Sequence, residues 1–284
     1  MDVHDYLKYK KRIIVKIGSS SLMHERTGRT DLNKIERLVR ELCDLQNQGY
    51  DVCLVTSGSI AIGRRVLGID TSPEQISTKQ ACAAVGQARL MTLYQRLFSE
   101  YHQQVAQILI TKNTILNDSS RANAQQTFEE LFRLGIIPIV NENDTVSTYE
   151  MKFGDNDTLS ALVASLVSAD LLILLSDIDG LYTDNPRTNP DATLIERVET
   201  ITDSYLEMAK GETGSAYGTG GMATKLTAAQ IATKSGADMI IVSGENPCII
   251  NQIIRGSFKG TLFLASKEPT FNLPEFMHNS LKDK

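Results

Sequence analysis

The segment DTLSALVASLVSADLLILLS, residues 157–176, joins a helical pattern directly to a strand pattern. Over residues 157–168 the leucines and valines recur at the spacing of one helix face, which predicts an amphipathic helix. The aliphatic run that follows predicts a strand over residues 171–176. A helix followed closely by a buried strand is typical of a domain in which helices cover a parallel sheet.

The same alternation extends in both directions along the chain. Further strands are predicted at 12–17, 52–56, 105–110, 136–140, 239–242 and 261–264, and further helices at about 32–48, 79–101, 122–134 and 225–235. This order predicts an α/β fold, a three-layer α/β/α sandwich around a mostly parallel central sheet. No linker is long or polar enough to divide the chain, so we expect one domain over 12–265 and a loosely held tail over 266–284.

Composition narrows the classes of partner. The 284 residues include 29 Lys and Arg against 34 Asp and Glu, a net charge of −5, and 42% are hydrophobic, which excludes a mainly disordered chain. An acidic balance argues against nucleic acid or an anionic membrane as the main partner but not against a small anion. No aliphatic run approaches the ~20 residues of a membrane span, and the first twelve residues are charged, so we expect a cytoplasmic protein.

The four cysteines and four histidines are scattered, and no C-x-x-C pair occurs. This spacing argues against a structural zinc site and against a disulfide framework. We expect inert thiols in a reducing compartment.

Two small-residue turns follow predicted strands. Lys16 is followed by Gly18 and three serines, a pattern suited to gripping a phosphate, although a lysine at an ordinary strand edge would look the same. In Val55-Thr-Ser-Gly-Ser59 the turn precedes a helix, whose free amides suit a carboxylate or phosphate. The alternative for this second turn is an ordinary helix cap.

Two segments concentrate acids and amides. Asn141-Glu-Asn-Asp144 follows a strand, and Gly154-Asp-Asn-Asp157 opens a helix. A carboxylate here can pair with a substrate ammonium, an asparagine amide can recognise a carboxylate, and Mg²⁺ held through water is a further option. Asp155 or Asp157 can instead cap the helix, which is the interpretation we favour for Asp155.

Two later segments suit a nucleotide. Ser176-Asp177 at a strand end can contact a ribose or base, or form only an Asx turn. Gly218-Thr-Gly-Gly-Met-Ala-Thr-Lys225 suggests an anion-binding turn, or a flexible loop with a solvated lysine; it matches neither the Walker A nor the Gly-x-Gly-x-x-Gly pattern. Two lysines, two glycine turns and two acidic clusters in one α/β chain favour the functional interpretation.

Taken together, these segments resemble the amino-acid kinase family, and within it the glutamate kinases. The matching stretches lie in order along the chain and are Val15-Lys-Ile-Gly-Ser-Ser20, Val55-Thr-Ser-Gly-Ser-Ile-Ala61, Lys79-Gln80, Ala84-Val-Gly-Gln87, Val140-Asn-Glu-Asn-Asp144, Phe153-Gly-Asp-Asn-Asp157, Leu159-Ser-Ala-Leu162, Asp177, Gly180-Leu-Tyr-Thr183 and Thr219-Gly-Gly-Met-Ala-Thr-Lys225. Ser19, Ser59 and Ser176 are small departures from the usual residues. Many relatives append a PUA domain, and we expect this chain to be a short form without it.

The resemblance implies transfer of the ATP γ-phosphoryl group to the γ-carboxylate of L-glutamate, the first step of proline synthesis. It implies a substrate side over about 12–168 and a nucleotide side over about 169–265. A carboxylate acceptor is already ionised, so positioning and charge stabilisation suffice and no general base is needed. The rival acceptors are N-acetylglutamate, aspartate, carbamate and UMP, and the rival class is a nucleotide-sensing module without turnover.

The resemblance also assigns residues and partners. It implies that Lys16 and Lys225 stabilise the transferring phosphoryl group and that Asp157 orients them, while Mg²⁺ is held through the ATP phosphates without direct protein ligands. The glutamate-binding residues would be Ser57, Asp144 and Asn156. The ATP-binding residues would be Lys16, Ser176, Asp177, Thr219, Gly220, Gly221, Met222, Ala223, Thr224 and Lys225. Implied partners are a glutamyl-phosphate reductase that receives the product, proline as feedback inhibitor, and further copies of the chain in a homo-oligomer.

Overall fold

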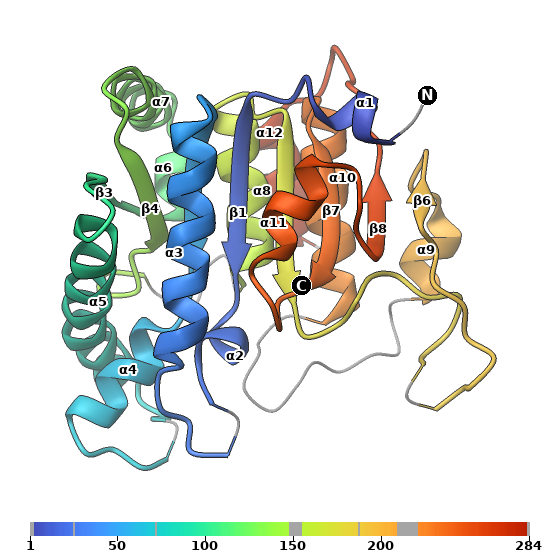
Figure 1. Cartoon of the computed structure of the whole chain (residues 1–284). Helices are drawn as coiled ribbons and strands as arrows, with labels where there is room; N and C mark the ends of the chain where they lie inside the picture. Colours follow the sequence, from blue (N-terminus) through green and yellow to red (C-terminus); the bar gives the residue numbers. More distant parts are fainter. Residues whose placement is uncertain are drawn as a thin grey trace.

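A computed structural model describes residues 3–24, 26–71, 73–147, 155–186, 188–208 and 221–282. Within these residues eight strands form one sheet in the order β3-β4-β2-β1-β5-β7-β8-β6 (Figure 1). The strands are β1 (Arg12–Ile17), β2 (Asp51–Thr56), β3 (Val105–Ile110), β4 (Ile137–Glu142), β5 (Leu171–Ser176), β6 (Arg197–Val198), β7 (Asp238–Ser243) and β8 (Gly260–Phe263). Every neighbouring pair is parallel except β7 with β8, which confirms the mostly parallel sheet.

Helices cover both faces of this sheet, as the sequence predicts (Figure 1). They are α1 (Val3–Leu7), α2 (Ser19–Leu22), α3 (Leu32–Asn47), α4 (Ser59–Val66), α5 (Ile76–Ser99), α6 (Lys112–Leu116), α7 (Asp118–Arg133), α8 (Asn156–Leu166), α9 (Asp203–Met208), α10 (Met222–Ser235), α11 (Ile249–Ile254) and α12 (Leu273–Lys282). Residues of α3, α5 and α11 enter one apolar cluster, and residues of α7, α8, α10 and α12 enter a second on the other face.

The period-2 alternation of strand side chains determines which face each residue serves. In β1, Ile13, Val15 and Ile17 belong to the α3/α5 cluster, whereas Ile14 belongs to the α8/α10 cluster. Lys16 has the same parity as Ile14, so its side chain is directed toward the face covered by α8 and α10. The buried pattern of β1 therefore places a lysine next to the amino-terminal ends of these two helices.

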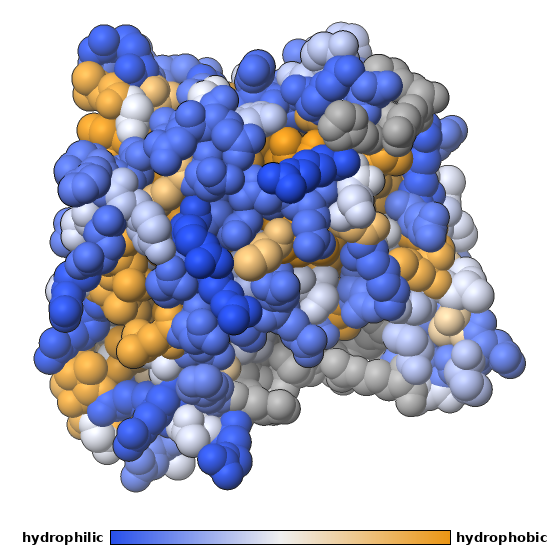
Figure 2. All heavy atoms as spheres, in the orientation of Figure 1, coloured by the Kyte–Doolittle hydropathy of each residue, from blue (hydrophilic) through white to orange (hydrophobic). Residues whose placement is uncertain are grey.

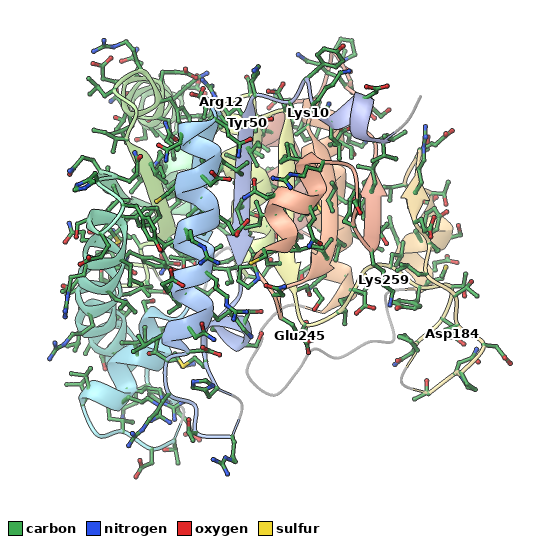
Figure 3. All side chains as sticks on the ribbon, in the orientation of Figure 1. Lys10, Arg12, Tyr50, Asp184, Glu245 and Lys259 are labelled. Carbon is green, nitrogen blue, oxygen red and sulfur yellow. The ribbon has the colours of Figure 1, made fainter. Side chains whose placement is uncertain are left out.

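Ion pairs connect the amino-terminal ends of several strands. Arg12 contacts Asp51 at 3.0 Å and Glu129 at 2.6 Å and lies over the ring of Phe132, and Lys10 contacts buried Asp238 at 2.6 Å. Figure 3 labels Lys10 and Arg12 at this edge, above the strand arrows. These ion pairs stabilise the amino-terminal ends of the strands, and we expect ligands at the opposite, carboxyl ends.

The carboxyl-terminal segment differs from the expectation of a loosely held tail. Residues 273–282 form α12, and Leu273 and Met277 are buried in the α8/α10 cluster together with half-buried Phe271 and Phe276. The segment shows no clear sequence pattern, yet it forms a helix, because Pro274 lies in the first turn, where proline interrupts no hydrogen bond. The fold thus continues past residue 265.

Three of the four cysteines are buried, and Cys248 is partly exposed. Cys43, Cys53, Cys82 and Cys248 are all free, and burial raises the pKa of Cys43 to about 12 and that of Cys53 further. Among the described helices, none combines the length and the apolar content that a bilayer crossing requires.

Candidate active site

The predicted site residues converge where the strand order reverses. The chain runs from β1 to β2 on one side and from β5 to β7 on the other, so the carboxyl ends of the central neighbours β1 and β5 form a topological switch point. Lys16 is the penultimate residue of β1, and Ser176 is the last residue of β5. Ligands of open α/β sheets bind at this position.

Lys16, Asp157 and Lys225 meet there although they come from three separate elements. Lys16 Nζ lies 2.5 Å from Asp157 Oδ1, and Lys225 Nζ lies 3.1 Å from Asp157 Oδ2. Asp157 is in the first turn of α8, and Lys225 is the fourth residue of α10. These two helices pack against each other. The structure therefore brings together all three residues that the sequence analysis assigned to phosphoryl transfer.

The electrostatics of this trio favour an anionic ligand. Lys16, Asp157 and Lys225 are 9%, 2% and 5% exposed. Burial alone raises the pKa of Asp157, but Lys16 and Lys225 outweigh it and lower the pKa to about 2, so the carboxylate is ionised. Two ammonium groups and one carboxylate leave one positive charge, and the amino-terminal ends of α8 and α10 add the positive ends of their dipoles. A phosphate group suits this environment.

Asp155 caps α8, as the sequence favours. Its carboxylate accepts hydrogen bonds from Thr158 N at 2.7 Å and Thr158 Oγ1 at 3.0 Å. Burial, reinforced by the neighbouring charge of Asp157, raises the pKa of Asp155. The cap fixes the first turn of α8 and with it the backbone that carries Asn156 and Asp157.

Ser57 and Asn156, two predicted glutamate-binding residues, are in direct contact. Asn156 Nδ2 donates to Ser57 Oγ at 2.7 Å and to Thr56 O at 2.8 Å. Ser57 lies in the turn between β2 and α4, where Gly58 has φ +102°, a left-handed conformation that favours glycine. The third predicted residue, Asp144, is half-buried two residues beyond β4. Among the described contacts of Asn156, none involves Asp144.

The predicted ATP-binding residues lie on the other side of the switch point, at the carboxyl end of β5 and the start of α10. Buried Ser176 donates to Asp177 Oδ1 at 3.1 Å, and Asp177 is exposed. Gly221 precedes α10, Met222 is buried and Ala223 is exposed in its first turn, and Thr224 Oγ1 donates to Gly221 O at 2.8 Å and to Asp157 Oδ2 at 3.3 Å. The predicted residues Thr219 and Gly220 lie outside the described residues.

A second layer of polar side chains supports the substrate side and was not assigned from the sequence. Asn141 Oδ1 accepts from Asn156 Nδ2 at 3.1 Å, and Asn141 Nδ2 donates to Gln87 Oε1 at 2.9 Å. Thr56 Oγ1 and buried Tyr94 Oη are 2.9 Å apart. Asn141 and Gln87 stand in the stretches that carry the family resemblance, but only the tertiary structure shows that these amides meet.

The donor set suits phosphates better than a directly bound metal. Within the described residues there is no group of three or more His, Cys, Asp or Glu side chains that could hold a metal ion. Both oxygens of Asp157 face lysines. A magnesium ion would therefore fit this site as a companion of the phosphates, with the protein contacting mainly the phosphate oxygens.

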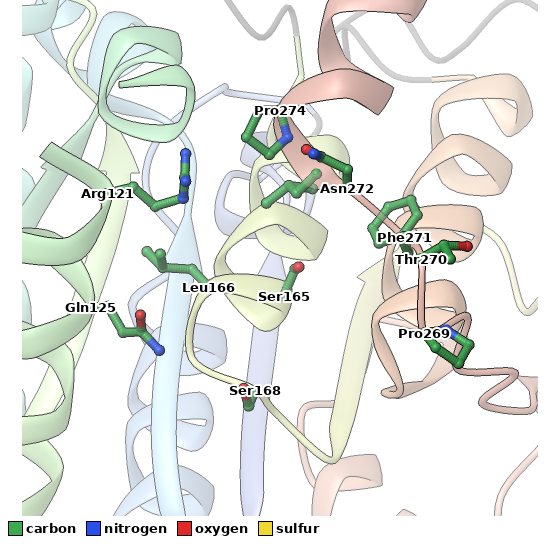
Figure 4. Close-up of a pocket in the computed structure, with 11 residues that line it drawn as sticks. Arg121, Gln125, Ser165, Leu166, Ser168, Pro269, Thr270, Phe271, Asn272 and Pro274 are labelled. Atoms are coloured by element: carbon green, nitrogen blue, oxygen red, sulfur yellow. The ribbon is translucent and has the colours of Figure 1, made fainter. Parts of the chain in front are cut away.

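A separate pocket lies at the far end of α8 (Figure 4). Its volume is about 460 Å³, and it is lined by Ser165 and Ser168 near the end of α8, by Arg121 and Gln125 of α7 and by residues 269–274. Asp157 is at the beginning of the eleven-residue α8 and this pocket at its end, about 15 Å apart at 1.5 Å per residue. The pocket is thus distinct from the lysine site.

Comparison with known sequences agrees with the class that this geometry indicates. The amino acid kinase family matches residues 11–243, and the chain belongs to that family. Its relatives include proteins named glutamate 5-kinase. One from Clostridium perfringens is 49% identical over 265 residues, covering 92% of this chain and 98% of the relative, and one from Synechocystis is 51% identical, covering 89% and 68%.

Solved structures show the same fold at low sequence identity. Carbamate kinase from Giardia lamblia bound to AMP-PNP matches with a TM-score of 0.65 at 18% identity, over 91% of this chain and all of that one. Isopentenyl phosphate kinase from T. acidophilum matches with a TM-score of 0.60 at 20% identity, over 89% and 100%. The predicted α/β/α architecture is thereby confirmed.

Proposed function

We propose that this chain is a glutamate 5-kinase, which transfers the γ-phosphoryl group of ATP to the γ-carboxylate of L-glutamate in proline synthesis. The observation that carries the proposal is the buried Lys16–Asp157–Lys225 cluster at the switch point of the sheet. Relatives of that name are about half identical in sequence over most of their length, which supports glutamate as the acceptor.

The reaction requires little chemistry from side chains. A γ-carboxylate oxygen of glutamate attacks the γ-phosphorus of ATP, the bond from that phosphorus to the bridging oxygen breaks, and ADP leaves with the electron pair. No proton has to move because the acceptor is already a carboxylate. The protein has to hold two anions in line and stabilise the charge on the transferring oxygens.

Lys16 and Lys225 are placed for this stabilisation. Asp157 holds each ammonium by one oxygen, so the two lysines are fixed before ATP arrives and do not lose freedom during the reaction. Mg²⁺, when bound with ATP, supplies further neutralisation of the phosphate charge. On the nucleotide side, Ser176, Asp177 and the 219–225 segment would hold ATP, with Met222 and Ala223 at the start of α10.

Glutamate would bind on the β2–β4 side of the lysines. Ser57 and Asn156 form a connected pair of polar groups, and Asp144 supplies a carboxylate for the substrate ammonium. This composition favours a free amino acid over UMP, which requires more cations, and over N-acetylglutamate, which has no ammonium.

An acceptor screen tests the proposal. The chain is incubated with ATP, Mg²⁺ and hydroxylamine, which traps an acyl phosphate as a coloured hydroxamate, with glutamate, N-acetylglutamate and aspartate offered separately. Carbamate and UMP are followed by ADP release. We expect the highest kcat/KM with glutamate. A higher value with another acceptor would overturn the assignment, and no turnover with any would favour a nucleotide-sensing module.

Two regulatory and metabolic partners follow from the same proposal. The acyl phosphate product hydrolyses readily, so we propose that a reductase specific for glutamyl phosphate consumes it. Proline carries the same α-carboxylate and an ammonium, and we propose that it inhibits by competing with glutamate. Competitive inhibition kinetics with proline against glutamate check this; inhibition that is unaffected by glutamate would contradict it.

We also propose that the chain is a homo-oligomer. Val66 and Leu67 of the α4 region are 47% and 46% exposed, and Ala81, Ala84 and Ala88 are exposed along α5. Figure 2 shows apolar side chains along the side of the molecule where Figure 1 places α4 and α5. Sedimentation velocity would show a concentration-dependent dimer or larger species, and a monomer at all concentrations would contradict the proposal.

A further inference from the structure

Gln87 of α5 is a buried amide that reaches the substrate side of the site through one neighbour. Its side chain is 7% exposed, and its Oε1 accepts from Asn141 Nδ2 at 2.9 Å. Among the described residues, no acceptor lies within hydrogen-bond distance of the buried Gln87 Nε2. An unsatisfied buried amide costs free energy, so a glutamine here calls for a reason beyond filling space.

Neighbouring backbone groups show which atom donates and which accepts in each hydrogen bond of this layer. Thr56 O can only accept, so the group of Asn156 that faces it at 2.8 Å is the NH₂. Glu142 N can only donate, and it lies 2.9 Å from Asn141 Oδ1, which also accepts from Asn156 Nδ2. The NH₂ group of Asn141 therefore faces Gln87, which has to present its carbonyl oxygen.

This direction determines what the ligand-facing residues offer. The described hydrogen bonds of Asn156 all leave from its NH₂ group, so Oδ1 is the atom that can accept from a ligand ammonium. Ser57 Oγ already accepts from Asn156, so its hydroxyl hydrogen can point to a ligand carboxylate. If the Asn141 amide rotated by half a turn, its NH₂ group would oppose that of Asn156, and both ligand contacts would change.

We propose that Gln87 is a positioning residue that fixes the amide orientation of Asn141, and through it the hydrogen-bonding pattern that Asn156 and Ser57 present to the amino-acid acceptor. The proposal rests on the proposed function of the site. The carbonyl of Gln87 is the acceptor that the NH₂ group of Asn141 requires, with Ser59 Oγ a weaker second one at 3.4 Å.

Close packing holds Gln87 in this place. The neighbouring Gly86 faces the beginning of α4 so closely that a Cβ there would lie 1.7 Å from Ser59 O. A side chain at residue 86 would therefore force the two helices apart. The absence of a side chain at Gly86 thus lets α5 lie against the turn that carries Ser57, within reach of Asn141.

The test compares Gln87→Met, Gln87→Glu and Gln87→Ala by steady-state kinetics. Met conserves the volume but removes the oxygen acceptor, whereas Glu keeps an oxygen acceptor for Asn141 and puts a carboxylate oxygen in place of the NH₂ group, which has no described partner. We expect Gln87→Met to raise KM for the acceptor about tenfold, as for a lost hydrogen bond of about 1.4 kcal/mol. KM for ATP should stay within about twofold, and Gln87→Glu should restore most of the acceptor KM. The control Gln95→Met changes an exposed glutamine of the same helix and should leave both constants unchanged.

Three results would overturn the proposal. They are an unchanged acceptor KM in Gln87→Met, an equal rise in the KM values for acceptor and ATP, and a Gln87→Glu variant that behaves as Gln87→Met does. Should Gln87→Met fail to fold, Gln87→Ala removes the same acceptor without added bulk, and the same KM split is expected. The comparison uses whichever acceptor the unaltered chain phosphorylates, so a failure of glutamate would overturn the proposed function and leave the Gln87 test intact.

Discussion

Asp157 binds Lys16 across the junction between sheet and helix, with Nζ 2.5 Å from Oδ1, and its other oxygen faces Lys225 at 3.1 Å. One carboxylate on α8 thereby connects the central strand β1 with the start of α10. Because the three groups are buried, the arrangement persists only while the carboxylate stays ionised and both lysines remain in place.

Asp157→Asn should lower stability and change its dependence on acid. A carboxyl with a folded-state pKa of about 2 and an ordinary value of 3.8 stabilises the fold above pH 3.8 and loses that contribution as the pH falls to 2. The difference corresponds to about 2 kcal/mol of unfolding free energy. Asp155, whose pKa is raised, acts in the opposite direction. Urea unfolding at ~four evenly spaced pH values between pH 6 and pH 2 measures this free energy of unfolding.

In that experiment Asp157→Asn should lose about 3 kcal/mol near neutral pH, since within the described residues the two buried ammonium groups have no other carboxylate partner. Its stability should then fall less steeply with acid than that of the unaltered chain. The control Glu207→Gln changes an exposed residue of α9 and should reproduce the unaltered profile. Identical acid slopes for Asp157→Asn and the unaltered chain would contradict the assignment.

Gly58→Ala should weaken acceptor binding through the backbone. Gly58 has φ +102°, so an alanine there costs about 1–2 kcal/mol and shifts the turn that carries Ser57. We expect a higher KM for glutamate and little change in KM for ATP. Gly68→Ala is the matched control, because Gly68 has φ +67° with open space around it and lies outside the site. Equal effects of the two substitutions on the glutamate KM would contradict this account.

Met277→Ala should destabilise the whole domain. Met277 is 5% exposed in the cluster shared with α8 and α10, and truncating such a side chain costs about 2–3 kcal/mol. Denaturant unfolding should shift its midpoint without a separate transition, whereas Glu275→Ala on the exposed side of α12 should have little effect. A midpoint unchanged by Met277→Ala would show that α12 is not part of the cooperative unit.

Local sequence patterns were sufficient to predict most strands of the sheet. The strands at 12–17, 105–110 and 171–176 begin and end where periodicity predicts, and the cap at Asp155 is confirmed by its two hydrogen bonds to Thr158. In each case the signal is carried by adjacent residues, whose side chains face the core or the helix end that they stabilise.

Contacts between distant residues account for what the sequence did not reveal. The hydrogen bond between Gln87 and Asn141 joins positions 54 residues apart, and no pattern within either helix or strand specifies which amides meet. The antiparallel pairing of β8 with β7 and the docking of α12 depend likewise on where the chain returns to the sheet. The resemblance identified the residues of the Lys16 cluster, whereas its distances required the tertiary structure.

The rate of hydroxamate formation from glutamate by Lys16→Ala, compared with the unaltered chain, tests the central claim most directly. If Lys16 stabilises the transferring phosphoryl group, kcat should fall by about 10²–10³-fold, while the circular dichroism spectrum stays that of a folded protein. The exposed Lys267→Ala variant should keep the original kcat. A folded Lys16→Ala variant with a kcat close to that of the unaltered chain would contradict the assigned role.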